Sequence, residues 1–205
     1  MAIFFGYDPG GQGNHGVAIA DIASDGTFSS EPELYLERNT GEVVRKFSQI
    51  NSVAAVGVDT LLAWSLNGGR ICDNVLRAKY STKSASIISQ NSLYSSMTIN
   101  GVMFALAVQE TQTPLYETHP KLILHIIDQV DEQCAELKER VFGLRGSATS
   151  KSRLKNADDM GDALVAAWCA SRGWYGKWPR DLFVVCGEDL IFPAGRASYP
   201  WPEDL

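Results

Sequence analysis

The sequence has few of the residues that build a zinc site or a disulfide framework. Its four cysteines are widely separated and form no Cys-x-x-Cys pair. This spacing argues against both kinds of site and is typical of free thiols in a reducing compartment. We therefore expect a cytoplasmic protein whose cysteines are ordinary buried thiols. They are Cys72, Cys134, Cys169 and Cys186.

The chain also lacks an apolar run long enough to span a membrane, and basic residues are not in excess. The apolar start from Ala2 to Phe5 is short and has no basic flank, so we expect mature chain there and not a signal peptide. The net charge of −6 argues against a general polyanion binder, but it permits nucleic-acid binding through a local basic patch. Acids gathered in a metal site would themselves contribute to this charge.

Length and composition predict one domain. The chain has 205 residues, of which 45% are hydrophobic, enough for one sizeable core and short for two full domains. We therefore expect a single domain over residues 1–205. It should close with a C-terminal hairpin of residues 183–186 and 190–193, followed by a short tail.

The order of apolar segments predicts an α/β fold with a mixed central sheet flanked by helices. A meander of three antiparallel strands should come first, because three β-like runs are joined by short turns. A helix over residues 40–50 and a buried strand over residues 53–59 follow, and this order favours parallel pairing. Residues 114–118 predict another strand, followed by one amphipathic helix up to Val141. The strands of the predicted meander are residues 3–8, 17–22 and 33–37.

Acidic residues recur where the apolar strands end. Asp8 ends the first strand, just before a glycine-rich turn, and Asp59 and Glu117 end the two later strands. Asp159 and Asp162 are three residues apart, so they share one face near the start of the last helix. The carboxyl ends of neighbouring parallel strands meet in one crevice, which is the usual ligand position in open α/β sheets. We therefore expect these acids to converge.

Converging carboxylates predict a metal site. They repel one another and have raised pKa values unless a cation lies among them. Oxygen ligands without histidine or cysteine clusters select Mg²⁺ or Mn²⁺. Two such ions, roughly 3.5–4 Å apart, could activate water on one side of a phosphodiester and stabilise the leaving oxygen on the other. The predicted catalytic and metal-binding residues are Asp8, Asp59, Glu117, Asp159 and Asp162.

Basic and histidine side chains are weaker candidates for binding substrate. His119 is next but one to Glu117 and could orient a ligand or transfer a proton. The basic segment of residues 143–156 could contact phosphates beside the acids, and a solvated loop explains that segment equally well. The candidates for substrate binding are His119, Arg70, Arg77, Lys151 and Arg153.

Each acid taken alone also fits a structural role. Asp8 and Asp59 can cap the turns that follow them, and Glu117 can pair with a lysine. Asp159 and Asp162 can favour a helix N-terminus electrostatically. Because an acid recurs at the end of several strands, a site shared by these acids is favoured over separate structural roles for each.

Several segments together resemble RNase H-like folds. The stretch from Gly6 to Gly11, continued through Ala18, is similar to the first hairpin of that fold class. More specifically, the chain resembles the nuclease family catalogued as domain of unknown function 429. The matching segments that follow, in chain order, are Val56 to Asp59, Arg70 to Asp73, Leu76-Arg77, Tyr116 to Pro120, Asp159 to Ala167 and Gly187 to Pro193.

This resemblance implies an RNase H-like fold, in which a late helix supplies the last acid. It also implies nuclease activity on nucleic acid, inferred in that family from its acids. RNase H-like resolvases often form dimers, so a homodimer through residues 99–109 or 122–141 is one option. Carried over by position, the expected metal ligands are Asp8, Asp59, Glu117 and Asp162, with Asp159 beside them.

Two other function classes fit parts of the same pattern. A strand, an aspartate and a glycine turn also begin actin- and sugar-kinase-like phosphotransferases, but those proteins normally close two such domains over ATP. A catalytically silent RNase H-like binding or scaffold protein would keep the fold and the acids without turnover. The first expectation is a metal-dependent nuclease that uses Mg²⁺ or Mn²⁺, and these two classes are its alternatives.

Overall fold

A five-stranded mixed sheet is the centre of the computed structural model, which describes residues 2–11, 13–66, 68–87 and 95–202. The strand order is β3-β2-β1-β4-β6. The first three strands form the predicted antiparallel meander, and β4 and β6 extend the sheet from β1 in parallel. The expected α/β fold with RNase H-like topology is confirmed. The strands are β1 (Ala2–Asp8), β2 (His15–Ile22), β3 (Glu33–Glu37), β4 (Val53–Val58) and β6 (Leu115–Glu117).

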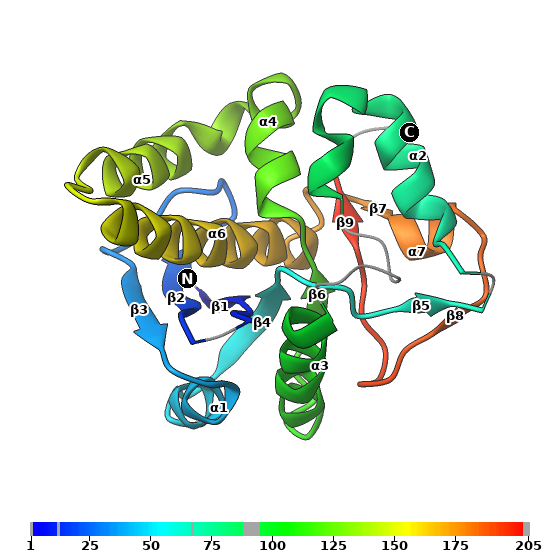
Figure 1. Cartoon of the computed structure of the whole chain (residues 1–205), viewed down its shortest axis with the longest axis horizontal. Coiled ribbons are helices and arrows are strands. Elements are labelled where there is room, and N and C mark those ends of the chain that lie inside the picture. Colours follow the sequence, from blue (N-terminus) through cyan, green and yellow to red (C-terminus); the bar gives the residue numbers. More distant parts are fainter. Residues whose placement is uncertain (1, 12, 67, 88–94, 203–205) are drawn as a thin grey trace.

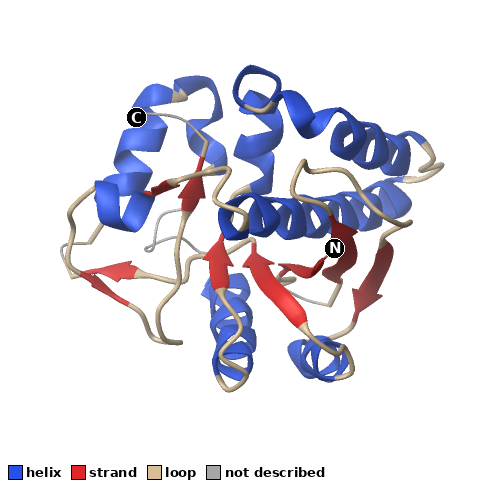
Figure 2. Cartoon of the chain, turned by 180° about the vertical axis from the view of Figure 1, so that it is seen from behind, coloured by secondary structure: helices blue, strands red, loops and turns tan. Residues whose placement is uncertain are grey.

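Helices cover both faces of this sheet (Figures 1 and 2). On one face lie α1 (Thr40–Ser48) and α3 (Ser95–Gln109). Across the other runs α6 (Lys151–Trp174), with α4 (Pro120–Val130) and α5 (Ala135–Gly146) packed against it. The shorter elements, most of them in a lobe beyond β6, are β5 (Trp64–Ser65), α2 (Ile71–Lys79), η1 (Ser81–Ser86), η2 (Glu132–Cys134), β7 (Arg180–Asp181), α7 (Leu182–Val185), β8 (Leu190–Ile191) and β9 (Pro200–Trp201).

Glycines in the central strands allow α6 to lie directly on the sheet. A Cβ atom at Gly6 or at Gly57 would collide with backbone carbonyl groups of α6. Side chains two positions apart in a strand point to the same face, so Asp8 and Asp59 share the face of these glycines. The close helix–sheet contact therefore brings α6 against the ends of β1 and β4.

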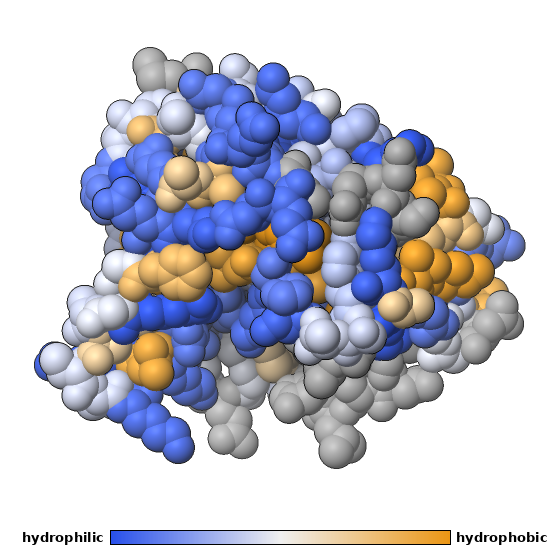
Figure 3. Space-filling model, turned by 90° about the horizontal axis from the view of Figure 1, so that it is seen from above, coloured by the Kyte–Doolittle hydropathy of each residue, from blue (hydrophilic) through white to orange (hydrophobic). Residues whose placement is uncertain are grey.

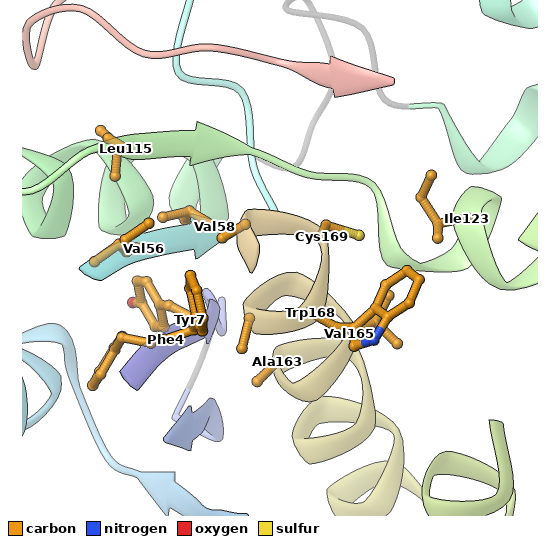
Figure 4. Packing of buried hydrophobic residues seen from close by; sticks show 14 of the residues in the cluster. Phe4, Tyr7, Val56, Val58, Leu115, Ile123, Ala163, Val165, Trp168 and Cys169 are labelled. Atoms are coloured by element: carbon orange, nitrogen blue, oxygen red, sulfur yellow. The ribbon is translucent and has the colours of Figure 1, made fainter. Parts of the chain in front are cut away.

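The core around α6 is mainly apolar. Figure 4 shows Ala163 on the sheet side of the helix and Trp168 and Cys169 on the side of Ile123 in α4. All four side chains are buried. The helix is in fact buried along its whole stretch from residue 161 to residue 172. A carboxylate inside this stretch, such as that of Asp162, is therefore costly unless a positive charge or hydrogen bonds compensate it.

The predicted C-terminal hairpin does not form. Residues 182–185 are helix α7, and β8 pairs with β5 and not with the residues before Gly187. Asp181 caps α7, because its side chain accepts a hydrogen bond from the N–H group of Phe183 at 3.1 Å. A short apolar run fits a helix or a strand by periodicity alone, and here the cap and the distant strand β5 decide between them.

The predicted helix up to Val141 is two helices. Between α4 and α5 the chain turns at Asp131, whose side chain caps η2 through the N–H group of Gln133. The same carboxylate accepts a hydrogen bond from the buried Arg172 side chain at 3.1 Å. This buried ion pair ties the turn to α6, so the two helices pack on α6 separately.

Of the two segments considered for a dimer interface, α3 presents exposed apolar side chains. Ile99, Met103 and Leu106 are 57%, 55% and 50% exposed and recur at helical spacing. None of the helices in the described ranges is long and apolar enough to cross a membrane. In the other segment, residues 122–141, six apolar side chains are buried in the core: Leu122, Ile123, Ile126, Ile127, Leu137 and Val141.

Candidate functional site

The strands β1, β4 and β6 end side by side at the carboxyl edge of the sheet. Their last paired row consists of Tyr7, Val58 and Glu117. Consecutive side chains of a strand point to opposite faces, so the residues one position later point to the face that α6 covers. Those residues are Asp8, Asp59 and Thr118.

Backbone hydrogen bonds continue the ladder into this second row. The N–H group of Asp59 donates to the Tyr7 carbonyl at 2.9 Å, and that of Thr118 donates to the Val58 carbonyl at 2.9 Å. The two residues therefore keep strand geometry although they follow the last residues of β4 and β6. Their side chains are held at the sheet edge by the same pairing that forms the sheet.

Helix α6 brings Asp159 and Asp162 to this edge. A Cβ atom at Gly16 of β2 would collide with the Asp159 carbonyl group, so glycine there permits the approach. The two aspartates lie well inside α6, whose N-cap is Ser150, and not near its start as expected. Their place beside the strand ends thus comes from packing on the sheet and not from a helix N-terminus.

The four aspartates raise one another's pKa values. Burial raises the pKa of Asp8 well above its ordinary value, and the other three carboxylates add to this effect. Burial and the neighbouring Asp162 raise the pKa of Asp59 to about 8. Burial raises the pKa of Asp162, and it raises that of Asp159 to about 6. The carboxyl groups of such a cluster stay ionised only when positive charge lies beside them.

Two basic side chains face Asp162. The Lys121 Nζ lies 3.6 Å from Asp162 Oδ2, and the Arg145 Nη2 lies 3.6 Å from Asp162 Oδ1. Burial alone lowers the pKa of Lys121, but Asp162, Asp59 and Asp8 raise it above its ordinary value. Lys121 is not among the site residues expected from the sequence. Its position in the first turn of the helix after the third acidic strand is the signal that could have found it.

The oxygen atoms of this cluster suit a hard divalent cation chemically. Three buried ones have no hydrogen-bond partner in the described part of the chain: Asp159 Oδ2, Asp162 Oδ1 and Thr118 Oγ1. Such oxygens are ligands that Mg²⁺ and Mn²⁺ accept. Among the residues described, however, no three carboxylate, histidine or cysteine side chains lie close enough to hold one ion together. Binding would therefore require the aspartate side chains to turn toward one another.

Glu117 lies on the opposite face and is bound to Arg70. The Arg70 Nη1 donates to Glu117 Oε2 at 2.8 Å, and its Nη2 lies 2.6 Å from Oε1. The N–H group of Leu62 also donates to Oε2, at 2.6 Å. Burial raises the pKa of Glu117, and Arg70 acts in the lowering direction. Both carboxylate oxygens thus already have partners inside the protein, although Glu117 lies near enough to Asp59 for its charge to help raise the pKa of Asp59.

Arg70 is engaged on every side of its guanidinium group. Besides Glu117 it binds Asp73 through Nε at 2.8 Å and through Nη2 at 2.7 Å, and it donates to the Ala63 carbonyl at 3.3 Å. Its exposure is 1%. Every nitrogen of its guanidinium group thus already has a partner inside the protein, and a role of Arg70 in substrate binding stays a prediction.

The other candidates for substrate binding are spread around the site. Arg77 donates to the carbonyl of Ile87 at 2.9 Å, which holds the end of η1. Lys151 and Arg153 are exposed in the first turn of α6, outside the aspartate cluster. His119 is half-buried at the N-cap of α4, next to Thr118. Of these four residues, His119 is nearest in sequence to the end of β6.

A pocket of about 420 Å³, open to solvent, lies beside the aspartates. Asp59, Thr118 and His119 line it, and so do the side chains of the Arg70 network, Arg70, Asp73 and Glu117. The pocket gives Asp59 and Thr118 a common opening toward solvent.

Figure 3, a view from above, shows a mainly hydrophilic surface with a hydrophobic patch on the side where α2 and α7 lie in Figure 1.

The strand order, the change from antiparallel to parallel pairing and the position of α6 define an α/β fold of RNase H-like topology, with an aspartate cluster at the carboxyl edge of its sheet. Comparison of the chain with protein-family models, curated proteins and solved structures finds no match. The resemblance to the nuclease family therefore rests on the sequence segments alone.

Proposed function

We propose that the protein is a metal-dependent nuclease that hydrolyses phosphodiester bonds of nucleic acid with Mg²⁺ or Mn²⁺. The observation that carries this proposal is the aspartate cluster on one face of the sheet edge, whose members all have raised pKa values. A divalent ion would supply the positive charge that such carboxylates need. The cluster consists of Asp8, Asp59, Asp159 and Asp162.

Each part of the cluster has a role in this proposal. Asp8, Asp59 and Asp162 would hold the ion, and Asp159 would accept hydrogen bonds from water beside it. A bound ion supplies Lewis acidity toward a phosphate oxygen and lowers the pKa of a water molecule. Lys121, which faces Asp162 at 3.6 Å, would attract the phosphate group. Exposed Lys151 and Arg153 could contact the nucleic-acid backbone without reading its sequence.

The test is calorimetric titration of the wild type and of Asp8→Asn with Mn²⁺, with folding checked by circular dichroism. DNA and RNA substrates, single- and double-stranded, are then incubated with Mg²⁺, Mn²⁺ or chelator. We expect Mn²⁺ binding and chelator-sensitive cleavage, both lost in the folded Asp8→Asn variant. Cleavage that persists in chelator, or in Asp8→Asn, would contradict the proposal.

A specific observation favours a second candidate, a catalytically silent RNase H-like binding or scaffold protein. Lys121 and Arg145 already face Asp162, and no three side chains among the described residues form a ready metal group. A folded wild type that binds no Mn²⁺ and cleaves no substrate would favour this candidate.

A second copy of the chain as partner, and a cytoplasmic location, belong to the same proposal. The exposed apolar side chains of α3 support the homodimer, and the four free cysteines agree with a reducing compartment. Sedimentation velocity of the wild type and of Met103→Glu tests the dimer. A wild type that sediments as a monomer at high concentration excludes it.

A further inference from the structure

We propose that β6 contributes the Thr118 hydroxyl group, and not the Glu117 carboxylate, to the cation site beside Asp8, Asp59 and Asp162. This inference rests on the proposed metal site and names one more of its ligands. Glu117 is then a structural residue, which holds Arg70 on the other face of the sheet. Three features of the structure support this proposal: the position of Thr118, its missing hydrogen bond and the engagement of Glu117.

The strand register determines the position of Thr118. Thr118 stands one position after the paired row that ends β6, as Asp8 and Asp59 do in β1 and β4. The three side chains therefore point to the face of α6, where Asp162 lies. Asp59, Thr118 and Glu117 all line one pocket, so the strand register and not the pocket distinguishes Thr118 from Glu117. Thr118 thus occupies, in the third of the neighbouring strands, the place that an aspartate occupies in the other two.

The second observation is the missing hydrogen bond of the Thr118 hydroxyl group. Its side chain is buried, with 5% of the residue exposed, and its Oγ1 has no hydrogen-bond partner among the described residues. Leaving a buried hydroxyl group without a hydrogen bond destabilises the folded protein. One oxygen each of Asp159 and Asp162 also lacks a hydrogen bond, although Arg145 lies 3.6 Å from that of Asp162. A cation held by Thr118 and Asp162, with a water molecule that donates to Asp159, would give each of these oxygens a partner.

The third observation is the chemical difference between the Glu117 and Thr118 side chains as ligands. Glu117 already uses both oxygens on Arg70 and Leu62, so recruiting it would break a buried ion pair. A threonine hydroxyl is a neutral oxygen donor. It adds a ligand without adding negative charge to carboxylates that already repel one another. The cluster therefore gains more from Thr118 than from a further acid.

The test is the Mn²⁺ affinity of Thr118→Val and Thr118→Ser, measured by calorimetry on the folded full chain. Valine keeps the shape and the β-branch but lacks the oxygen, and serine keeps the oxygen. We expect valine to weaken Mn²⁺ binding by about tenfold or more, and serine to stay within about twofold of the wild type. Thr113→Val, the same change at a half-buried threonine two residues before β6, should leave Mn²⁺ affinity unchanged.

Melting in chelator checks that the effect is not a folding defect. Because valine removes an unpaired buried hydroxyl group, Thr118→Val should melt at or above the wild-type temperature there. Glu117→Gln should melt lower but bind Mn²⁺ with near wild-type affinity below its melting temperature. The inference is overturned if Thr118→Val binds as the wild type does, or if Glu117→Gln alone loses binding while folded. A wild type without Mn²⁺ binding instead removes the proposed metal site itself, together with this inference.

Discussion

At the scale of single residues, Arg70 determines which acids are available for chemistry. Its guanidinium group holds Asp73 and Glu117 in one buried network and has no nitrogen left for a substrate. Two carboxylates next to one guanidinium group stay ionised when buried only while that group is present. The network therefore stabilises the junction between β6 and α2, and it occupies the Glu117 carboxylate, which would otherwise be available to a cation.

Removing this guanidinium group should destabilise the fold. Arg70→Met leaves two buried carboxylates without a partner, for which we expect a loss of about 3–5 kcal/mol in the free energy of unfolding. Urea unfolding followed by circular dichroism measures it. Arg153→Met, the same change at an exposed position, should stay within about 0.5 kcal/mol of the wild type. A similar stability for both variants would show that the network contributes little.

A neutral side chain at Asp59 should act in the opposite direction. The raised pKa of about 8 means that the charged form of Asp59 is disfavoured in the folded protein. Asp59→Asn in chelator at pH 8 should therefore raise the free energy of unfolding by roughly 1–2 kcal/mol, and the melting temperature by about 2–4 °C for each kcal/mol. Asp189→Asn, at an exposed aspartate, is the control. A lower melting temperature for Asp59→Asn in chelator would contradict the clustering of like charges.

At the scale of elements, the contact between α6 and the sheet positions the site. Gly6, Gly16 and Gly57 lie where any Cβ atom would meet the backbone of α6. Each larger residue would push the helix away from the strand ends and so move Asp162 from Asp8 and Asp59. The geometry of the cluster therefore depends on residues that carry no chemistry of their own.

Gly57→Ala tests this dependence. The new methyl group would collide with the Ala166 carbonyl group, and we expect destabilisation of about 1–3 kcal/mol with weaker Mn²⁺ binding in the folded fraction. Gly143→Ala in α5 is the matched control, since nothing lies within 4 Å of its added methyl group. Thermal melting and calorimetry measure the two effects. Wild-type behaviour of Gly57→Ala would mean that α6 need not lie so close.

At the scale of the whole molecule, the cluster should make stability depend on pH. The pKa values of Asp8, Asp59 and Asp162 are raised on folding, so the folded protein holds protons that the unfolded chain releases. Stability is then highest below the ordinary aspartate pKa and falls as pH rises toward the folded values, near 8 for Asp59.

Melting temperatures in chelator between pH 5 and 8.5 measure this dependence. We expect a fall across the range, and a smaller fall with saturating Mn²⁺, because a bound cation stabilises the ionised carboxylates. Asp59→Asn should also flatten the curve in chelator. A melting temperature that rises with pH in chelator would mean that other groups outweigh the cluster.

Much of the fold could be predicted from the sequence because its signals are local. Alternating or continuous apolar runs with short turns predicted the meander and β4, and helical spacing predicted α1, as observed. The errors fell on ambiguous apolar runs. Residues 182–185 are helical because Asp181 caps them, and the helix predicted up to Val141 breaks where Asp131 binds Arg172. Neither contact partner is visible from the local pattern.

The sequence by itself determined the order of the elements, the free cysteines and the presence of an acid at each strand end. Only the tertiary structure decided which acids share a face. A difference of one residue in a strand turns a side chain to the opposite face, so the register of β6 against β4 separates Thr118 from Glu117. That register depends on long-range pairing, and the partner of Glu117 is an arginine from a distant segment that folds beside it.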